Sequence, residues 1–167
     1  MTVSLLRRVR RNHALEHATI NLLNRRHPQA LLIGMSNPLG FTLYTDLYAD
    51  EVVPALKDAI RQLGAGKSAL AYHSNCGTNM VAAAALTMLA TMLGLGGSDC
   101  SFEERVERVP KTLLLNVLAL LAARAVGPWL QAHLTVDPYI AGVEIASVFT
   151  DYSGRVHRIR INLRHAG

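Results

Sequence analysis

The sequence is poor in the residues that typically mark soluble domains and nucleic-acid-binding proteins. Only 17% of its 167 residues are charged, against about 25% in a typical soluble domain, and 50% are hydrophobic. Aromatic residues make up 5% of the chain, so its apolar content is mainly Leu, Ala and Val. The net charge of +5 would suit nucleic acid, but the basic residues do not alternate with the aromatic side chains on which bases stack. We therefore expect no nucleic-acid partner.

Cysteine is scarce, and several signatures are missing. Cys76 and Cys100 allow one disulfide at most, which excludes a disulfide-stapled scaffold. The N-terminus lacks a short apolar segment with a cleavage site, so we expect no removed signal peptide. The Gly-x-Ser-x-Gly pattern of serine hydrolases is also missing. The length fits one domain, or a small domain with a membrane insertion.

A glycine-rich loop at Gly64-Ala65-Gly66-Lys67-Ser68 superficially resembles a phosphate-binding loop. The full pattern requires glycine at position 61, which is Arg61 here, and the loop follows a predicted helix instead of a strand. These differences argue against nucleotide binding. The glycines instead predict a helix stop, followed by a short extended segment over 69–72.

The most informative stretch lies in a basic amphipathic helix predicted over residues 2–26. His13 and His17 are four residues apart, so both rings project from the same helix face and can bind one metal ion. Glu16 lies about 60° around the helix from His13 and about 100° from His17. A carboxylate there can act on a metal-bound water without being a ligand. His-x-x-Glu-His is also the inverted form of a known zinc-hydrolase motif.

A second motif supports the metal hypothesis. His73 and Cys76 are separated by two residues, a spacing at which one turn of backbone can present two ligands to one metal. Gly77 then permits a tight backbone course. Beside His73, the Cys76 thiol is better interpreted as a ligand than as half of a disulfide.

In this order, the two motifs resemble those of a bacterial family of uncharacterised integral-membrane proteins described as predicted metal-dependent enzymes. That family carries His-x-x-Glu-His, followed by His-x-x-Cys-Gly-Thr just before a hydrophobic segment. The matching positions here are His13, Glu16, His17, His73, Cys76, Gly77 and Thr78, and Met80 opens the hydrophobic segment. The resemblance covers only these two islands and their order. It implies a metal site beside a membrane and no particular substrate.

Two hydrophobic stretches follow, at 80–95 and 113–130, joined by a polar connector at 98–111. Each is marginal against the roughly 20 residues that cross a bilayer. The alternative is a pair of buried helices in a soluble α+β core, but two stretches so rich in Leu and Ala favour a membrane hairpin. We expect Arg124 to snorkel or to face the partner helix or a polar cavity.

The remaining segments predict strands and one helix. Hairpin strands are expected at 30–35 and 41–48, a helix at 51–63, and a second hairpin at 143–149 and 156–163. These elements predict an α+β fold, with a small antiparallel sheet built from two β-hairpins. The N-terminal helices pack on that sheet, and a two-helix hydrophobic hairpin is inserted between its halves.

This organisation divides the chain into an N-terminal α+β half (1–79), the hydrophobic helical hairpin (80–131) and a C-terminal β-hairpin that completes the sheet (132–167). Most Lys and Arg residues flank the hydrophobic hairpin, which predicts an inner-membrane protein with both termini and the metal residues on the cytoplasmic side. The early arginines are either a solvated face or a surface attracted to anionic lipid head groups. These are Arg7, Arg8, Arg10 and Arg11.

The leading functional hypothesis is a membrane-associated metal-dependent hydrolase. His13, His17 and one or both of His73 and Cys76 would bind zinc or another divalent metal, leaving a position open for water if three residues ligate. Glu16 would be the general base. Membrane lipid is an expected partner, and peptide, lipid and a small conjugate are all compatible substrates.

Other residues and functions remain open at this point. Asn12, Thr78 and Asn79 are candidates to position substrate, and Glu144 is a candidate for a distant carboxylate ligand. If four residues ligate, the site is closed and structural, and the protein is a non-catalytic binding or scaffold protein. A third possibility is a redox-sensing thiol at Cys76.

Overall fold

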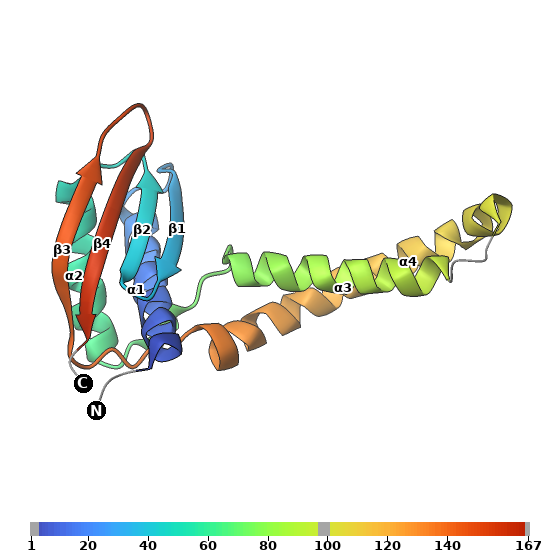
Figure 1. The fold of residues 1–167 in the computed structure, drawn as a ribbon, viewed down its shortest axis with the longest axis horizontal. Coiled ribbons are helices and arrows are strands. Elements are labelled where there is room, and N and C mark those ends of the chain that lie inside the picture. Colours follow the sequence, from blue (N-terminus) through green and yellow to red (C-terminus); the bar gives the residue numbers. More distant parts are fainter. Residues whose placement is uncertain (1–3, 97–100, 166–167) are drawn as a thin grey trace. The chain divides into compact units, whose positions relative to one another are not determined.

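The computed structural model describes residues 4–96 and 101–165 and has the predicted α+β architecture (Figure 1). Helices and an antiparallel sheet are both present, and two of the helices are long and strongly apolar. In chain order the elements are α1 (Leu5–Arg26), β1 (Leu32–Asn37), β2 (Gly40–Thr45), α2 (Ala49–Gly64), the 3-10 helix η1 (Ser68–Ala71), α3 (Gly77–Leu95), α4 (Phe102–Leu130), the π-helical turn η2 (Gln131–Thr135), β3 (Val143–Asp151) and β4 (His157–His165).

The chain forms two compact units. Unit 1 comprises Met1–His73 and Leu134–Gly167, and unit 2 comprises Ser74–His133. Unit 1 contains the sheet with α1 and α2, whereas unit 2 contains the helical hairpin of α3 and α4. Cys100, which was considered above as a disulfide partner, lies outside the described residues.

The sheet of unit 1 has the strand order β1-β2-β4-β3, and every neighbouring pair is antiparallel. The last strand therefore lies inside the sheet, where it pairs Phe41 with Ile161 on one side and Val148 with Ile161 on the other. β4 alternates as predicted, because its branched apolar residues are buried and its arginines are exposed. The two predicted hairpins thus form one sheet.

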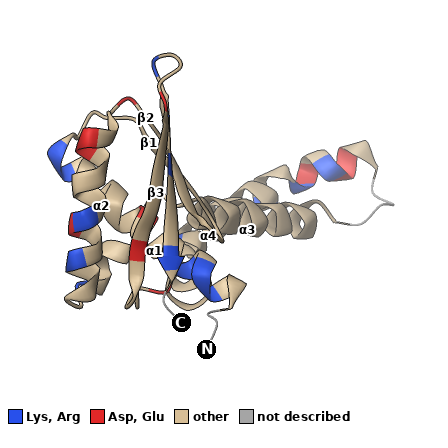
Figure 2. Ribbon diagram, turned by 60° about the vertical axis from the view of Figure 1, so that its left-hand side comes forward, with Lys and Arg blue, Asp and Glu red and all other residues tan. Residues whose placement is uncertain are grey.

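The core of unit 1 lies between this sheet and the two helices on one of its faces (Figure 2). Phe41 and Leu43 from β2 and Ile159 from β4 are fully buried, as are Leu15 and Leu56 from the helices. Helix α1 begins after Ser4, whose hydroxyl accepts a hydrogen bond from the Arg7 amide, and it ends at Arg26 before His27-Pro28. The core therefore fixes the face of α1 that carries the histidine motif.

The extended segment predicted over 69–72 is wrong, because residues 68–71 form the 3-10 helix η1. Side chains of α1 determine this conformation. The Asn21 amide nitrogen donates to the carbonyls of Leu70 and Tyr72, and the His17 ring bonds the carbonyl of Ala71. Three backbone carbonyls of this segment thus accept hydrogen bonds from side chains of α1, so the segment does not require pairing with a neighbouring strand.

Unit 2 is a hairpin whose helices pack closely through small and polar residues. A Cβ added to Gly94 would lie 2.4 Å from the Thr112 hydroxyl, so only glycine permits this approach. Asn116 donates to the Thr91 hydroxyl at 3.0 Å across the two helices. The second helix begins earlier than its hydrophobic stretch because Ser101 and Glu104 form a capping box.

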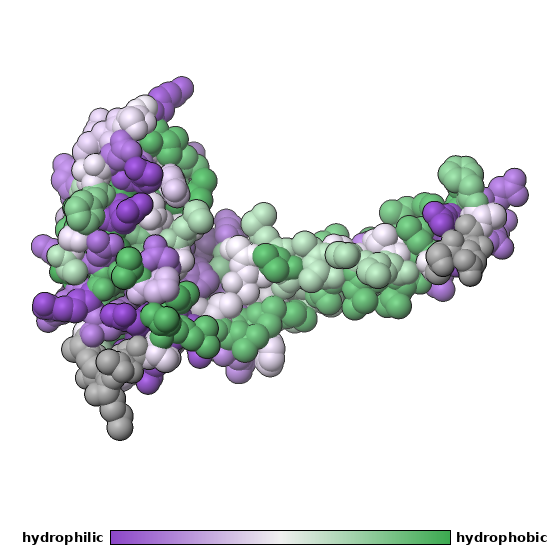
Figure 3. All heavy atoms as spheres, viewed as in Figure 1, coloured by the Kyte–Doolittle hydropathy of each residue, from purple (hydrophilic) through white to green (hydrophobic). Residues whose placement is uncertain are grey.

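The surface of unit 2 is largely apolar (Figure 3). The ranges Gly77–Leu95 and Phe102–Thr135 are each long and apolar enough to cross a membrane. Only 17% and 11% of their most apolar windows are buried, whereas a core helix of a soluble protein would be mostly buried. Arg124 is exposed on this surface, so it does not pack against the partner helix.

Candidate metal centre

Helix α1 presents His13 and His17 one turn apart on one face. Their ring centroids are 4.2 Å apart, at an interplanar angle of 61°. His17 is buried and His13 is half-buried. This is the arrangement that the four-residue spacing predicts, and it places two imidazoles where a single ion can contact both.

Backbone carbonyls determine which nitrogen of each ring can bind a metal. The Nδ1 atom of His13 lies 3.0 Å from the carbonyl oxygen of Thr135, and that of His17 lies 2.8 Å from the carbonyl oxygen of Ala71. A carbonyl oxygen only accepts, so each Nδ1 carries the proton and donates it. The lone pair of each neutral ring is then on Nε2. Metal-binding histidines are oriented in this way in known sites.

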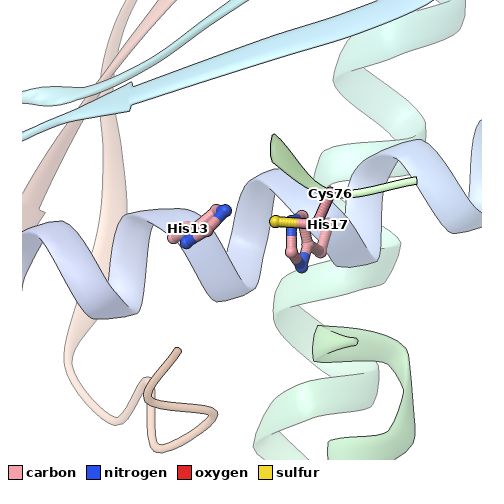
Figure 4. A group of neighbouring side chains, drawn as sticks. All are labelled: His13, His17 and Cys76. Carbon is pink, nitrogen blue, oxygen red and sulfur yellow. The ribbon is translucent and has the colours of Figure 1, made fainter. Parts of the chain in front are cut away.

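The third member of the group is Cys76, three residues after His73. One ligand atom each from His13, His17 and Cys76 lie within 4.8 Å of one another (Figure 4). Cys76 is buried and precedes the first turn of α3, where its sulfur accepts a hydrogen bond from the Thr78 amide at 3.4 Å. The positive end of the helix dipole favours a negatively charged sulfur there. Two nitrogens and one sulfur form a donor set suited to zinc.

His73 is near this group but is not a member of it. Its ring centroid lies 5.9 Å from that of His17. The described residues contain the group of His13, His17 and Cys76 and no other set of three or more such side chains with this spacing. Ligation by His73 stays a prediction.

The side chain of Glu16 lies against β1. Its Oε2 atom accepts a hydrogen bond of 2.5 Å from the Ser36 hydroxyl. A Cβ added to Gly34 would lie 2.3 Å from Oε1, so the carboxylate occupies the space that the missing side chain leaves. Glu16 is buried, and it does not belong to the three-residue group. Its catalytic role stays a prediction.

The residues predicted to position substrate have structural contacts. Asn12 is fully buried, donates to the carbonyl of Asn37 at 2.7 Å and lies 2.8 Å from Nε2 of His165 through its amide oxygen. It therefore joins α1 to the C-terminal ends of β1 and β4, which lie at the same end of the sheet. The Thr78 amide bonds Cys76, as described above.

Asn79 has two partners within unit 2. Its amide nitrogen donates to the carbonyl of Ser74, and its oxygen accepts from the Gln131 amide at 2.7 Å. Gln131 is only 1% exposed. Sequence analysis missed this residue, since a glutamine at the end of a hydrophobic stretch carries no motif. The Thr135 carbonyl was missed for the same reason.

Glu144 lies away from the group. It is an exposed residue of β3, and one of its oxygens accepts a hydrogen bond from the Arg164 guanidinium on β4. This cross-strand ion pair explains a carboxylate on an otherwise apolar strand. The structure gives no support for Glu144 as a distant ligand.

Fold and site together define an α+β protein with an apolar two-helix hairpin and a His-His-Cys group capable of binding a metal. The chain belongs to the family described as a domain of unknown function, DUF6391, whose model matches residues 8–148. It is 30% identical over 177 residues to an uncharacterized protein of Picosynechococcus sp., a match that covers 95% of this chain and 81% of that relative. No solved structure matches the chain. Neither match adds evidence for the integral-membrane family of predicted metal-dependent enzymes.

Proposed function

We propose that this protein is a membrane-anchored metal-dependent hydrolase. The observation that carries the proposal is the group of His13, His17 and Cys76, in which one ligand atom from each residue lies within 4.8 Å of the others, and in which His17 and Cys76 are buried. The backbone carbonyls that orient both imidazoles add to it, because metal-binding histidines typically donate their other ring N–H to such an acceptor. Three protein ligands are the number found in catalytic zinc sites.

The group fits zinc by its chemistry, since zinc accepts imidazole nitrogen and thiolate sulfur in tetrahedral sites. When bound, the metal would polarise the substrate and lower the pKa of water towards neutrality. His13 and His17 would hold it through Nε2, and Cys76 through its sulfur.

Glu16 is the residue that we assign as general base. It immediately precedes His17 on α1, and the Ser36 hydroxyl fixes one of its carboxylate oxygens. It would take the proton of the attacking water and return it to the leaving group. Peptide, lipid and small conjugate substrates all remain compatible with this chemistry.

The membrane part of the proposal is supported by unit 2. Its two helices are long and apolar enough to span a bilayer and bury little of their surface against each other. Lys and Arg are concentrated outside the hairpin, and under the positive-inside rule this distribution favours a cytoplasmic location for the termini and the metal group. The N-terminal arginine cluster is consistent with this side.

Metal analysis of the purified protein tests the site. We expect about one zinc per chain, and loss of most of it in His13→Ala, His17→Ala and Cys76→Ala. His27→Ala is the matched control, because His27 lies outside the group and pairs with Glu51. Metal content that is equal in all four variants would contradict the site.

A closed structural site is the second candidate, and the proximity of His73 to His17 favours it. If His73 completes four-coordination, His73→Ala should lower metal affinity as strongly as Cys76→Ala. Glu16→Gln separates the two functions. In a hydrolase it keeps metal and fold but abolishes turnover of a panel of peptide, lipid and ester substrates, whereas a structural site has no turnover to lose.

A further inference from the structure

The first two turns of α1 combine exposed apolar side chains with a dense positive charge. Leu5 and Leu6 are 65% and 70% exposed, so they contribute little to the core of unit 1. Arg7 and Arg8 follow them directly, and the start of α1 is visibly basic (Figure 2). The two leucines and the two arginines thus place apolar surface directly beside positive charge, a combination typical of helices that lie at a membrane interface.

The fold uses part of this charge. Arg11 is 4% exposed, lies 3.7 Å from the Asp137 carboxylate and places its guanidinium 5.4 Å from the ring centre of Tyr139. Arg10 donates to the carbonyl of Val136. These contacts fasten the segment after η2 to α1.

The remaining charge is directed outward. Arg7 shares the Asp137 carboxylate with Arg11, and its side chain is still 54% exposed. Arg8 makes no ion pair within residues 4–96 and 101–165. The Asp137 carboxylate is thus shared by Arg7 and Arg11, and Arg8 adds further positive charge beside them.

Tyr139 contributes a third apolar side chain at this place. It is 62% exposed, and the Arg11 guanidinium beneath its ring holds it beside α1. Tyrosine has an apolar ring and a polar hydroxyl, which suits the boundary between lipid head groups and acyl chains. Leu5, Leu6, Arg7, Arg8 and Tyr139 are called the basic apolar patch below.

We propose that the basic apolar patch binds anionic phospholipids, with the arginines on the head-group phosphates and the apolar side chains at the acyl boundary. The charge complementarity favours an anionic lipid surface, and the same chain carries two helices that are long and apolar enough to cross a membrane. The exposed leucines beside the arginines also favour a lipid surface over an acidic peptide as the partner, because acyl chains offer them an apolar environment. Lipid binding by the patch rests on the membrane anchoring proposed above and requires neither a bound metal nor turnover.

The test uses the full chain with tryptophan as a depth reporter. Leu6→Trp in a Trp129→Phe background is reconstituted into vesicles of phosphatidylcholine, with or without about 30% phosphatidylglycerol, and quenched by brominated phosphatidylcholine. We expect strong quenching with the anionic lipid and weak quenching without it. Arg7→Gln and Arg8→Gln should each weaken the bound population about five-fold, and raised salt should act in the same direction.

Two controls isolate the patch. Arg25→Gln removes the same charge from the exposed far end of α1 and should leave the quenching unchanged. A tryptophan at Tyr152, in the loop at the opposite end of β4, should remain unquenched. Quenching at position 6 that is absent, or that is the same with and without anionic lipid, overturns the proposal. Both results leave the metal measurements unaffected.

Discussion

The two units of this protein have apolar residues of similar kinds and use them in opposite ways. In unit 1, Leu15, Leu23 and Leu56 are fully buried between helices and sheet. In unit 2, Leu113 and Leu118 are 62% and 53% exposed, and the contacts between α3 and α4 include close approaches of glycine, threonine and asparagine. The apolar residues of unit 1 are therefore buried within the chain, whereas many of those in unit 2 are exposed on its surface.

This contrast has an energetic reason. Water drives the burial of leucine in unit 1, at roughly 25 cal/mol per Å² of apolar surface. In lipid that driving force between helices is missing, and close packing of small residues with a few hydrogen bonds takes its place. The following substitutions test this difference, from the largest expected effect to the smallest.

Leu15→Ala should have the largest effect. Leu15 is completely buried in the core of unit 1, and truncating such a leucine costs about 3 kcal/mol of unfolding free energy. Leu118→Ala, on the exposed surface of unit 2, should cost less than about 0.5 kcal/mol. Denaturant unfolding in mild detergent measures both. Equal costs would remove the distinction between the two units.

Leu118→Arg should have a large effect in unit 2, where Leu118→Ala has a small one. The affected quantity is membrane insertion and not the stability of unit 1. An arginine near the middle of a spanning helix raises the insertion free energy by about 3 kcal/mol relative to leucine. The fraction of protein that resists carbonate extraction from membranes should fall. Tyr152→Arg, an exposed site on unit 1, is the matched control and should leave the membrane fraction unchanged.

Gly34→Ala should destabilise unit 1 by about 2 kcal/mol, because the added methyl group overlaps the Glu16 carboxylate and must displace it from Ser36. Gly64→Ala is the control, since nothing lies within 4 Å of its added Cβ and the helix propensity of alanine is higher. Thermal unfolding of the two variants measures the difference. If the Gly34→Ala variant were as stable as the parent, the Glu16 carboxylate would not pack against Gly34 as described.

Asn116→Ala tests the polar contact inside the hairpin. Interhelical hydrogen bonds in membranes contribute about 0.6 kcal/mol on average, so losing the pair with Thr91 should destabilise unit 2 only slightly. A double-mutant cycle with Thr91→Ala isolates this energy. A coupling above about 2 kcal/mol would indicate that the pair is essential to the hairpin.

The smallest expected effect is a change in titration. Burial lowers the pKa of His165, and the positive charges of Arg8 and Arg11 lower it further. The folded protein thus takes up this proton at lower pH than the unfolded chain, so stability falls as pH drops below the ordinary histidine value of about 6.5. Arg8→Gln should raise the pKa of His165, as followed by NMR of labelled histidine, and Arg25→Gln should not.

Periodicity predicted most of the fold. The strict alternation of Ile159, Ile161 and Leu163 gave β4, and the spacing of His13 and His17 gave one face of α1. The start of α4 was missed although Ser101 and Glu104 form a capping box that is readable in the sequence. Residues 68–71 were mispredicted because their conformation depends on hydrogen bonds from a distant helix.

The site was less accessible than the fold to sequence reasoning. Motif spacing nominated Cys76, but no local pattern shows that it approaches His13 and His17, since packing of distant segments decides this. The carbonyls of Ala71 and Thr135 that orient the rings belong to the backbone, and any residue type can supply them. The contact of Glu16 with Ser36 likewise depends on how α1 packs against β1.

The interior position of β4 has a consequence for synthesis on the ribosome. The strand that joins β2 to β3 is the last of the four strands to emerge, so the sheet cannot close until β4 has been synthesised. Both helices of the hairpin are made before that moment. We expect the hairpin to enter the membrane before β4 has paired with β2. The unit that carries the histidines would then complete its folding after the chain is already attached to the bilayer.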